Sequence, residues 1–216
     1  MRIDRNIRPA AADVDAEKPR TLAELNAVIS AAEPLVEGGT KAVLGEGPVG
    51  ARIALVGEQP GDQEDLQGRP FVGPAGRLLD RALSAAGIER KSTYVTNAVK
   101  HFKFEERGKR RLHKKPSAGE VKHYRWWLKT ELELVDPRLV VALGATAVQS
   151  LAQRALPVTK VRGPYDFGSQ RGFITVHPSY LLRLPRAPGD DLAKREYEAF
   201  VRDLQRIGDL APAIRS

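Results

Sequence analysis

The stretch 108–116 (GKRRLHKKP) contains one histidine, His113, among five positive charges: Lys109, Arg110, Arg111, Lys114 and Lys115. These cations favour the neutral form of the imidazole ring, because they repel a further positive charge. A neutral imidazole can act as a base or as a nucleophile. We therefore expect an anionic partner at this stretch. His113 either contacts that partner as one more polar group of a basic loop, or reacts with it.

Polar residues follow four short apolar runs that we interpret as strands. They are Glu58, Gln59 and Asp62 after the first run, Asn97 after the second, Gly144 and Thr146 after the third, and His177 and Ser179 after the fourth. Singly, each residue is typical of ordinary turn chemistry. Together, acid, amide and imidazole groups at matching strand ends could recognise and protonate a small polar ring.

The loop 57–76 (GEQPGDQEDLQGRPFVGPAG) is the most distinctive segment of the chain. Its glycines permit close approach of the backbone to a ligand. Phe71 stands in polar surroundings, where its ring could stack on a nucleobase or simply anchor the loop in the core. The loop is neither a dinucleotide fingerprint nor a phosphate-binding P-loop, since both glycine patterns are absent.

Apolar runs alternate with amphipathic segments, a pattern typical of a parallel sheet covered by helices on both faces. We expect strands within 51–63, 92–100, 137–147 and 171–182, and helices within 21–35, 75–88, 117–135, 146–156 and 190–210. Function should lie in the loops at the carboxyl ends of the strands. Residues 1–20 lack periodicity and read as a flexible arm before a single domain, 21–216.

The composition favours a polyanionic partner. The formal net charge is +8, and the segment 100–125 carries ten Lys and Arg against three Glu. Such clustered basic charge is typical of nucleic-acid binding. The chain has no cysteine, which excludes disulfides, thiolate nucleophiles and cysteine-ligated metal sites. There is no signal-peptide pattern or membrane-length apolar run, so we expect a cytoplasmic, nucleoid-associated monomer.

Four segments resemble the uracil-DNA glycosylase superfamily, close to its family 4: the loop 57–76, TNAVKHFKF (96–104), LVVALGATA (139–147) and VHPSYLLR (176–183). The stretch KRRLHKKP (109–116) is similar to the insertion that marks the UdgX branch. The resemblance implies a three-layer α/β/α fold with a central, mostly parallel four-stranded sheet. It also implies an enzyme of base excision repair that flips uracil out of single-stranded and double-stranded DNA and cleaves its glycosidic bond.

The resemblance also implies roles for single residues. Asn97 would read the uracil edge, Phe71 would stack on the flipped base, and His177 would donate to the uracil carbonyl that gains negative charge. Gln59 is counted with the catalytic residues and Asp62 with the substrate-binding ones. The backbone of Gly57 and Gly61, together with Ser179, would contact phosphates, and the five cations around His113 would hold the DNA backbone.

In the UdgX branch the histidine of the insertion attacks the sugar C1′ and stays joined to the DNA, while a glutamate orients it. The matching residues are His113 and Glu58. Two other interpretations remain open at this point. The chain could be a multiple-turnover glycosylase that uses water on uracil or a wider range of damaged bases, or a non-catalytic DNA binder.

The chain departs from these relatives in one respect. Family 4 and UdgX proteins carry a [4Fe-4S] cluster, whose cysteines align near Ser30, Glu33 and Tyr124, while His101 stands in VKHF. Without cysteine no such cluster can be bound, so we expect no cofactor. We expect instead that Tyr124, Trp126 and Trp127 pack against the first helix, and that His101 and His123 are structural or phosphate-contacting residues.

Overall fold

The structure is a computed structural model that describes residues 18–185 and 191–211. Residues 1–17 of the predicted arm lie outside this part of the chain. No helix in the described ranges is long and apolar enough to cross a membrane.

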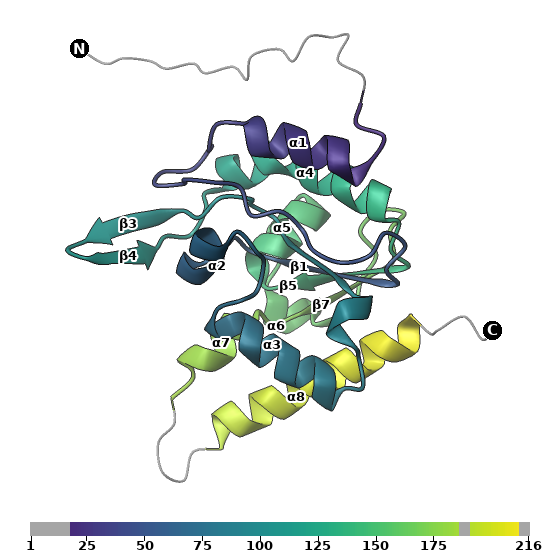
Figure 1. Ribbon diagram of the computed structural model, residues 1–216. Coiled ribbons are helices and arrows are strands. Elements are labelled where there is room, and N and C mark those ends of the chain that lie inside the picture. Colours follow the sequence, from purple (N-terminus) through teal and green to yellow (C-terminus); the bar gives the residue numbers. More distant parts are fainter. Residues whose placement is uncertain (1–17, 186–190, 212–216) are drawn as a thin grey trace.

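A five-stranded sheet in the order β2-β1-β5-β7-β6 forms the centre of the molecule (Figure 1). Its strands are β1 (Ile53–Gly57), β2 (Tyr94–Asn97), β5 (Leu139–Leu143), β6 (Gly163–Pro164) and β7 (Gly172–Thr175). The four predicted strands correspond to β1, β2, β5 and β7, and all pairings among them are parallel. The fifth strand, β6, is an addition to the prediction. It is two residues long, too short for a sequence pattern, and pairs antiparallel with β7.

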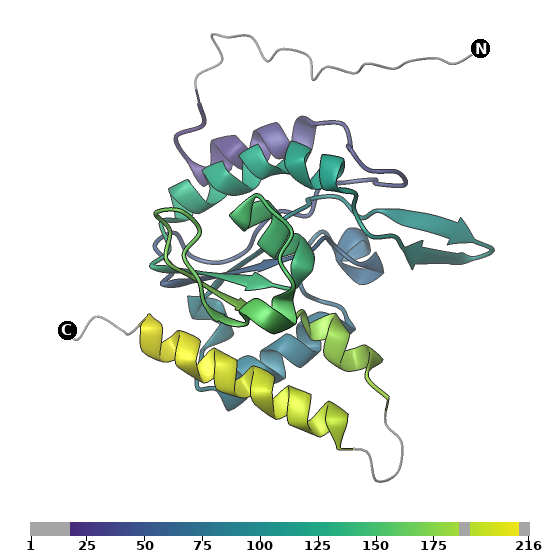
Figure 2. The same ribbon diagram turned by 180° about the vertical axis from the view of Figure 1, so that it is seen from behind.

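Helices cover both faces of the sheet, which confirms the predicted three-layer architecture (Figures 1 and 2). On one face lie α4 (Ala118–Val135) and α5 (Ala145–Ala152), with α1 (Leu22–Ala31) against α4. On the other face lie α3 (Pro74–Ala85) and α8 (Leu192–Leu210). Because both faces are covered, every residue of β1, β2, β5 and β7 is buried.

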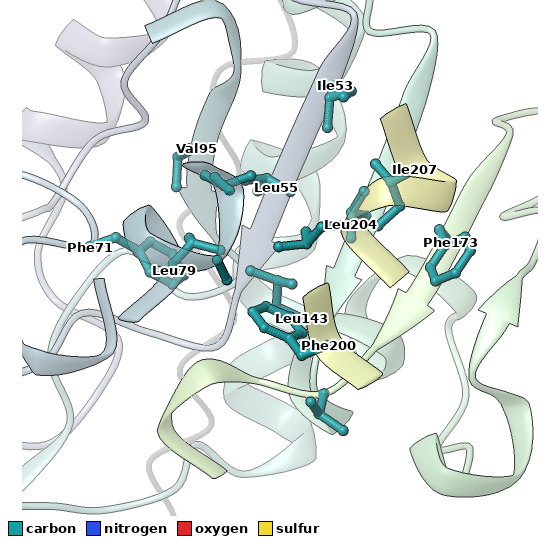
Figure 3. Packing of buried hydrophobic residues seen from close by; sticks show 14 of the residues in the cluster. Ile53, Leu55, Phe71, Leu79, Val95, Leu143, Phe173, Phe200, Leu204 and Ile207 are labelled. Carbon is teal, nitrogen blue, oxygen red and sulfur yellow. The ribbon is translucent and has the colours of Figure 1, made fainter. Parts of the chain in front are cut away.

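The larger core cluster joins α3 and α8 to the sheet (Figure 3). Leu79 of α3 and Phe200, Leu204 and Ile207 of α8 are fully buried against side chains from the strands. Burial of each such side chain contributes roughly 1.5–3 kcal/mol. Phe71 belongs to the same cluster, so the loop 57–76 is fastened to the core at that residue.

Local sequence sets where the main helices begin and end. Thr21 caps α1 by accepting the Glu24 N–H, and Ser117 and Glu120 form a reciprocal capping box at the start of α4. Helix α3 ends at its cap, Ala86, and Gly87 after it takes a positive φ of 74°, which glycine adopts readily.

The basic stretch that we expected to be a loop is a β-hairpin. Strands β3 (Phe104–Arg107) and β4 (Arg110–His113) pair antiparallel and project from the body of the molecule (Figure 1). Arg107 pairs with Arg110, so Gly108 and Lys109 form a two-residue turn, and Gly108 supplies the positive φ of 62° that such turns require. The remaining elements are α2 (Asp62–Gln67), η1 (Arg90–Ser92), α6 (Val158–Val161) and α7 (Pro178–Arg183).

Candidate active site

A cavity of about 1000 Å³ opens at the carboxyl ends of the parallel strands. The chain runs from β1 to β2 on one side of β1 and places β5 on its other side, so the strand order reverses at β1. Ligands of open α/β sheets bind at such a switch point. The cavity is lined by residues of all four predicted strand ends and of the hairpin, among them Glu58, Asn97, Gly144, His177 and His113. The predicted convergence of these groups is therefore present.

Glu58 links the sheet to the hairpin. Its Oε2 accepts a hydrogen bond from Thr146 Oγ1 at 2.6 Å, and its Oε1 lies 3.1 Å from His113 Nε2. Burial raises the pKa of Glu58, but the hydrogen bonds from His113 and Thr146 lower it by more, so its pKa lies below the usual value. An ionised Glu58 fixes the proton of His113 on Nε2 and leaves Nδ1 with a free lone pair.

His113 lies at the last residue of β4, and its side chain is 49% exposed. Its ring stands 6.2 Å from that of Phe102. The imidazole is therefore held between Glu58 and an aromatic wall, with its remaining surface open to the cavity and solvent.

His177 caps α7, and this fixes its tautomer. Its Nδ1 accepts the Ser179 N–H at 3.1 Å and lies 2.8 Å from Ser179 Oγ. Burial lowers the pKa of His177 to about 4, and the nearby carboxylate of Glu58 opposes this only in part. The ring is therefore neutral near pH 7, and its proton is on Nε2 because Nδ1 is an acceptor. Ser179 thus positions His177. The sequence had predicted only a phosphate contact for Ser179.

Asn97 and Phe71 form the inner wall of the cavity. Asn97 is 2% exposed, and its Oδ1 has no hydrogen-bond partner among the described residues. A buried unpaired oxygen costs free energy, which a ligand with an N–H group would recover. Phe71 has a positive φ of 56°, a strained conformation that holds its ring 5.8 Å from that of His177.

Glycines make this wall possible. A Cβ atom on Gly57 would collide with Asn97 Oδ1 and with the Phe71 ring, and a Cβ atom on Gly76 would collide with the Phe71 carbonyl. Gly57 is buried and makes room for the two side chains, while its phosphate contact stays a prediction. The Gly61 N–H donates to Glu64 Oε2 at 3.0 Å, so this amide too is engaged within the protein.

Gln59 fastens the base of the hairpin. Its Nε2 donates to the carbonyls of Lys103 and Lys114, and its Oε1 accepts the Lys103 N–H. Both ends of the Gln59 amide are thus engaged with the hairpin, and the catalytic role of Gln59 stays a prediction. Its β-hairpin partners lie 44 and 55 residues away, which sequence reasoning had no signal to find.

Arg111 fastens the middle of the hairpin. Its guanidinium pairs with Asp62 and Asp65 of α2 at 2.6 and 2.5 Å and lies over the rings of Phe102 and Phe104. Asp62 was predicted to bind substrate and Arg111 to bind DNA, but their charges satisfy one another. The pair joins the hairpin to the loop that carries Glu58, and the substrate and DNA contacts of the two residues stay predictions.

The other predicted DNA-binding cations are exposed, and they differ in whether an acidic side chain of the protein lies close to them. Lys109 and Arg110 are exposed at the hairpin turn, and Lys115 lines the mouth of the cavity. Lys114 is exposed and lies 3.2 Å from Glu37, an ion pair that solvent screens strongly.

Comparisons with known proteins agree with this arrangement. Residues 44–205 match the family described as the uracil DNA glycosylase superfamily, and they include every residue of the cavity wall. The chain belongs to the uracil DNA glycosylase superfamily. Its relatives include type-4 uracil-DNA glycosylases, which confirms the resemblance to family 4.

The type-4 enzyme of Thermotoga maritima is 41% identical over 153 residues, which are 69% of this chain and 76% of the relative. The type-4 enzyme of Pyrobaculum aerophilum is 35% identical over 166 residues, 73% of this chain and 81% of the relative. The type-4 enzyme of Archaeoglobus fulgidus is 33% identical over 180 residues, 79% of this chain and 82% of the relative.

The residues at the aligned cluster positions do not fit an iron-sulfur cluster. Ser30 and Glu33 are exposed, whereas Tyr124 is fully buried and its hydroxyl lies 2.8 Å from His101 Nδ1. None of them is a thiolate, and no group of three or more His, Cys, Asp or Glu in the described ranges could hold a metal ion. Tyr124 and Trp127 pack with Val36, which follows α1, whereas Trp126 is 47% exposed, so the prediction that Trp126 packs there was wrong.

Proposed function

We propose that this superfamily member is a uracil-DNA glycosylase that excises uracil from single-stranded and double-stranded DNA and keeps the sugar covalently attached to His113. The names of the type-4 relatives support the substrate and the bond that is cleaved. The cavity supports a base that leaves the helix, since its volume of about 1000 Å³ can hold a pyrimidine ring with its sugar.

Three side chains suit recognition of uracil and of its departing anion. The unpaired Oδ1 of Asn97 can accept the imide N–H of the base, and the ring of Phe71 can stack on it. The Nε2–H of neutral His177 can donate to the carbonyl that gains negative charge as the glycosidic bond breaks. Burial keeps the His177 ring uncharged in the free protein, so it would act as a neutral hydrogen-bond donor.

The covalent step follows from the Glu58–His113 pair. The bond between C1′ and the uracil nitrogen breaks, and its electron pair leaves with the base as the uracil anion. The free lone pair of His113 forms a new bond to the cationic C1′. The imidazole then carries a positive charge, and its Nε2 proton moves toward the Glu58 carboxylate at 3.1 Å, which stabilises the product.

The observation that carries this proposal is the 3.1 Å contact between His113 and Glu58 at the mouth of a cavity that also contains Asn97, Phe71 and His177. A basic hairpin that only held phosphates would have no need for its histidine to meet the partly buried carboxylate of Glu58. The exposed cations Lys109, Arg110 and Lys115 are suited to holding the DNA backbone around this point.

Incubation with a single-stranded oligonucleotide containing one uracil, followed by denaturing electrophoresis, tests the proposal. We expect a protein–DNA adduct from the wild-type chain and none from His113→Ser. Alkali treatment of the same samples reports abasic sites. Abasic product without adduct in the wild type would replace the covalent step with attack by water, and intact uracil under all conditions would overturn the glycosylase function itself.

A further inference from the structure

Residues 98–103 connect the base-reading Asn97 with the hairpin that carries His113. On one side their backbone is bound to the catalytic loop: the Ala98 N–H donates to the Gly57 carbonyl and the Val99 N–H to the Glu58 carbonyl, each at 3.0 Å. Any displacement of this segment would therefore move Asn97, Glu58 and the hairpin relative to one another.

On its other side the segment reaches α4 through three side chains. Lys100 Nζ donates to Glu131 at 2.5 Å, His101 Nδ1 lies 2.8 Å from Tyr124 Oη, and Lys103 Nζ donates to Glu120 at 2.7 Å. We call these three pairs the buried ladder. Their partners on α4 follow one another along the helix, so the segment lies along α4 from its capped start toward its C-terminal half.

The ladder is closed to water over most of its length. Lys100 and Glu131 are fully buried, His101 is 1% exposed and Tyr124 is 0% exposed. Tyr94 and Thr96 of β2 donate to the same Glu131 carboxylate, and Tyr124 also accepts the N–H of Leu35 after α1. Buried ion pairs add little net stability, because desolvation offsets their attraction, but a broken pair is costly. Such a network therefore fixes one arrangement more than it raises stability.

We infer that the buried ladder positions the segment 98–103, and with it Asn97 and the hairpin, and that it does so without a metal cofactor. The inference rests on the proposed function for its effect on uracil excision. Two of the residues that align with or stand beside cluster cysteines, Tyr124 and His101, are bonded to each other within the ladder. The ring of Trp127 packs against both members of this hydrogen-bonded pair.

Two conservative variants test the ladder. Tyr124→Phe keeps the ring but removes the hydroxyl that joins His101 to Leu35, and Lys103→Met keeps the stem but removes the ion pair with Glu120. Ile207→Val, on the core face of α8, is the control that lowers stability without touching the segment. Hydrogen exchange of residues 98–113 is measured in each, together with the fraction of excised uracils that end as adduct rather than as abasic sites.

Both ladder variants should speed exchange across 98–113 by about tenfold, because local opening becomes easier, while Ile207→Val leaves this segment unchanged relative to the rest of the chain. They should also lower the adduct fraction on the order of tenfold, since a displaced His113 lets water compete. Unchanged exchange in both variants overturns the ladder. Faster exchange in a protein whose wild type shows no adduct upholds the ladder and overturns only the covalent proposal.

Metal independence is tested separately by thermal unfolding of protein produced without iron and treated with a chelator. We expect the same midpoint as for protein incubated with iron and sulfide, and no visible colour in either. A higher midpoint or a brown protein after incubation would overturn the metal-free part of the inference.

Discussion

At the scale of single residues, the sharpest prediction concerns Asn97. Its Oδ1 is buried and unpaired, so the free protein carries a cost that a ligand N–H removes. Asn97→Ala should slow single-turnover excision of uracil by about 100-fold, since a buried base would lose both its acceptor and its donor. Fluorescence of the two tryptophans serves as the folding control. A variant that excises at the wild-type rate would exclude Asn97 from base recognition.

His101 gives the stability of the protein a defined pH dependence. Burial lowers its pKa to about 4, and the charge of Asp65 opposes this in part. The unfolded chain, with an ordinary histidine pKa of about 6.5, binds more protons than the folded chain between these values. The His101 contribution to the unfolding free energy is therefore complete above about pH 6.5 and is lost as the pH falls toward 4.

Urea unfolding at about pH 7 and about pH 4.5 measures this loss, which for His101 is on the order of 3 kcal/mol at most. His101→Gln keeps a hydrogen-bonding group for Tyr124 but does not titrate, so its stability should fall less over the same interval. His123 is exposed and serves as the matched control position. His123→Gln should lose as much unfolding free energy between the two pH values as the wild type does. An equal loss in wild type and His101→Gln would contradict the assignment.

The residues whose convergence the sequence predicted are those at the ends of strands. Glu58, Asn97 and His177 follow apolar runs, and parallel strands bring such positions together at one edge. The roles that it missed depend on interactions between distant segments. Gln59 binds backbone of the hairpin, and Asp62 pairs with Arg111, and neither interaction leaves a periodic signal in the chain.

At the scale of elements, the hairpin β3–β4 determines where His113 stands. Arg111 joins it to α2 through Asp62 and Asp65, and Asp65 is almost fully buried. Arg111→Met would leave that carboxylate with only Thr40 as a side-chain donor among the described residues. The hairpin should loosen, and adduct formation at saturating DNA should slow on the order of tenfold or more.

Arg107→Met is the control for this prediction, because it removes the same charge from an exposed position on the same hairpin. Adduct formation by Arg107→Met should stay within about twofold of the wild type, since surface substitutions rarely disturb structure. Equal rates for Arg111→Met and Arg107→Met would mean that the hairpin does not need its anchor on α2.

The hairpin itself could have been found in the sequence. Gly108 and Lys109 separate two four-residue segments, and glycine in a two-residue connection is a hairpin signal. The six charged residues around Gly108 in 105–111 hid this signal, because such a charged stretch is typical of a solvated loop. Only Phe104 faces the interior along β3, so the alternation expected of a strand is weak.

At the scale of the whole molecule, the net charge of +8 predicts strongly salt-dependent DNA binding. Lys109 and Arg110 are exposed at the hairpin turn and have the geometry to meet phosphates. Replacing both by alanine should reduce the slope of log K against log salt by about 0.7 for each single-strand phosphate that the variant no longer neutralises. Fluorescence anisotropy with a uracil-free oligonucleotide measures the slope, and an unchanged value would remove the turn from the DNA-binding surface.

The overall architecture was predictable because β1, β2, β5 and β7 are short apolar runs separated by amphipathic helices. Such a pattern permits few arrangements other than a parallel sheet with helices on both faces. The short elements β6, α6 and α7 were not predicted, because two to six residues carry too little periodicity.

The central claim is that a nitrogen of His113 becomes bonded to the sugar C1′. Protein incubated with uracil-containing single-stranded DNA is digested with nuclease and with a protease that cleaves after glutamate, and the peptides are weighed by mass spectrometry. The account predicts a deoxyribose-phosphate on peptide 107–120, whose one histidine is His113. The same peptide at its unmodified mass, in a sample whose uracils have all become abasic sites, would contradict it.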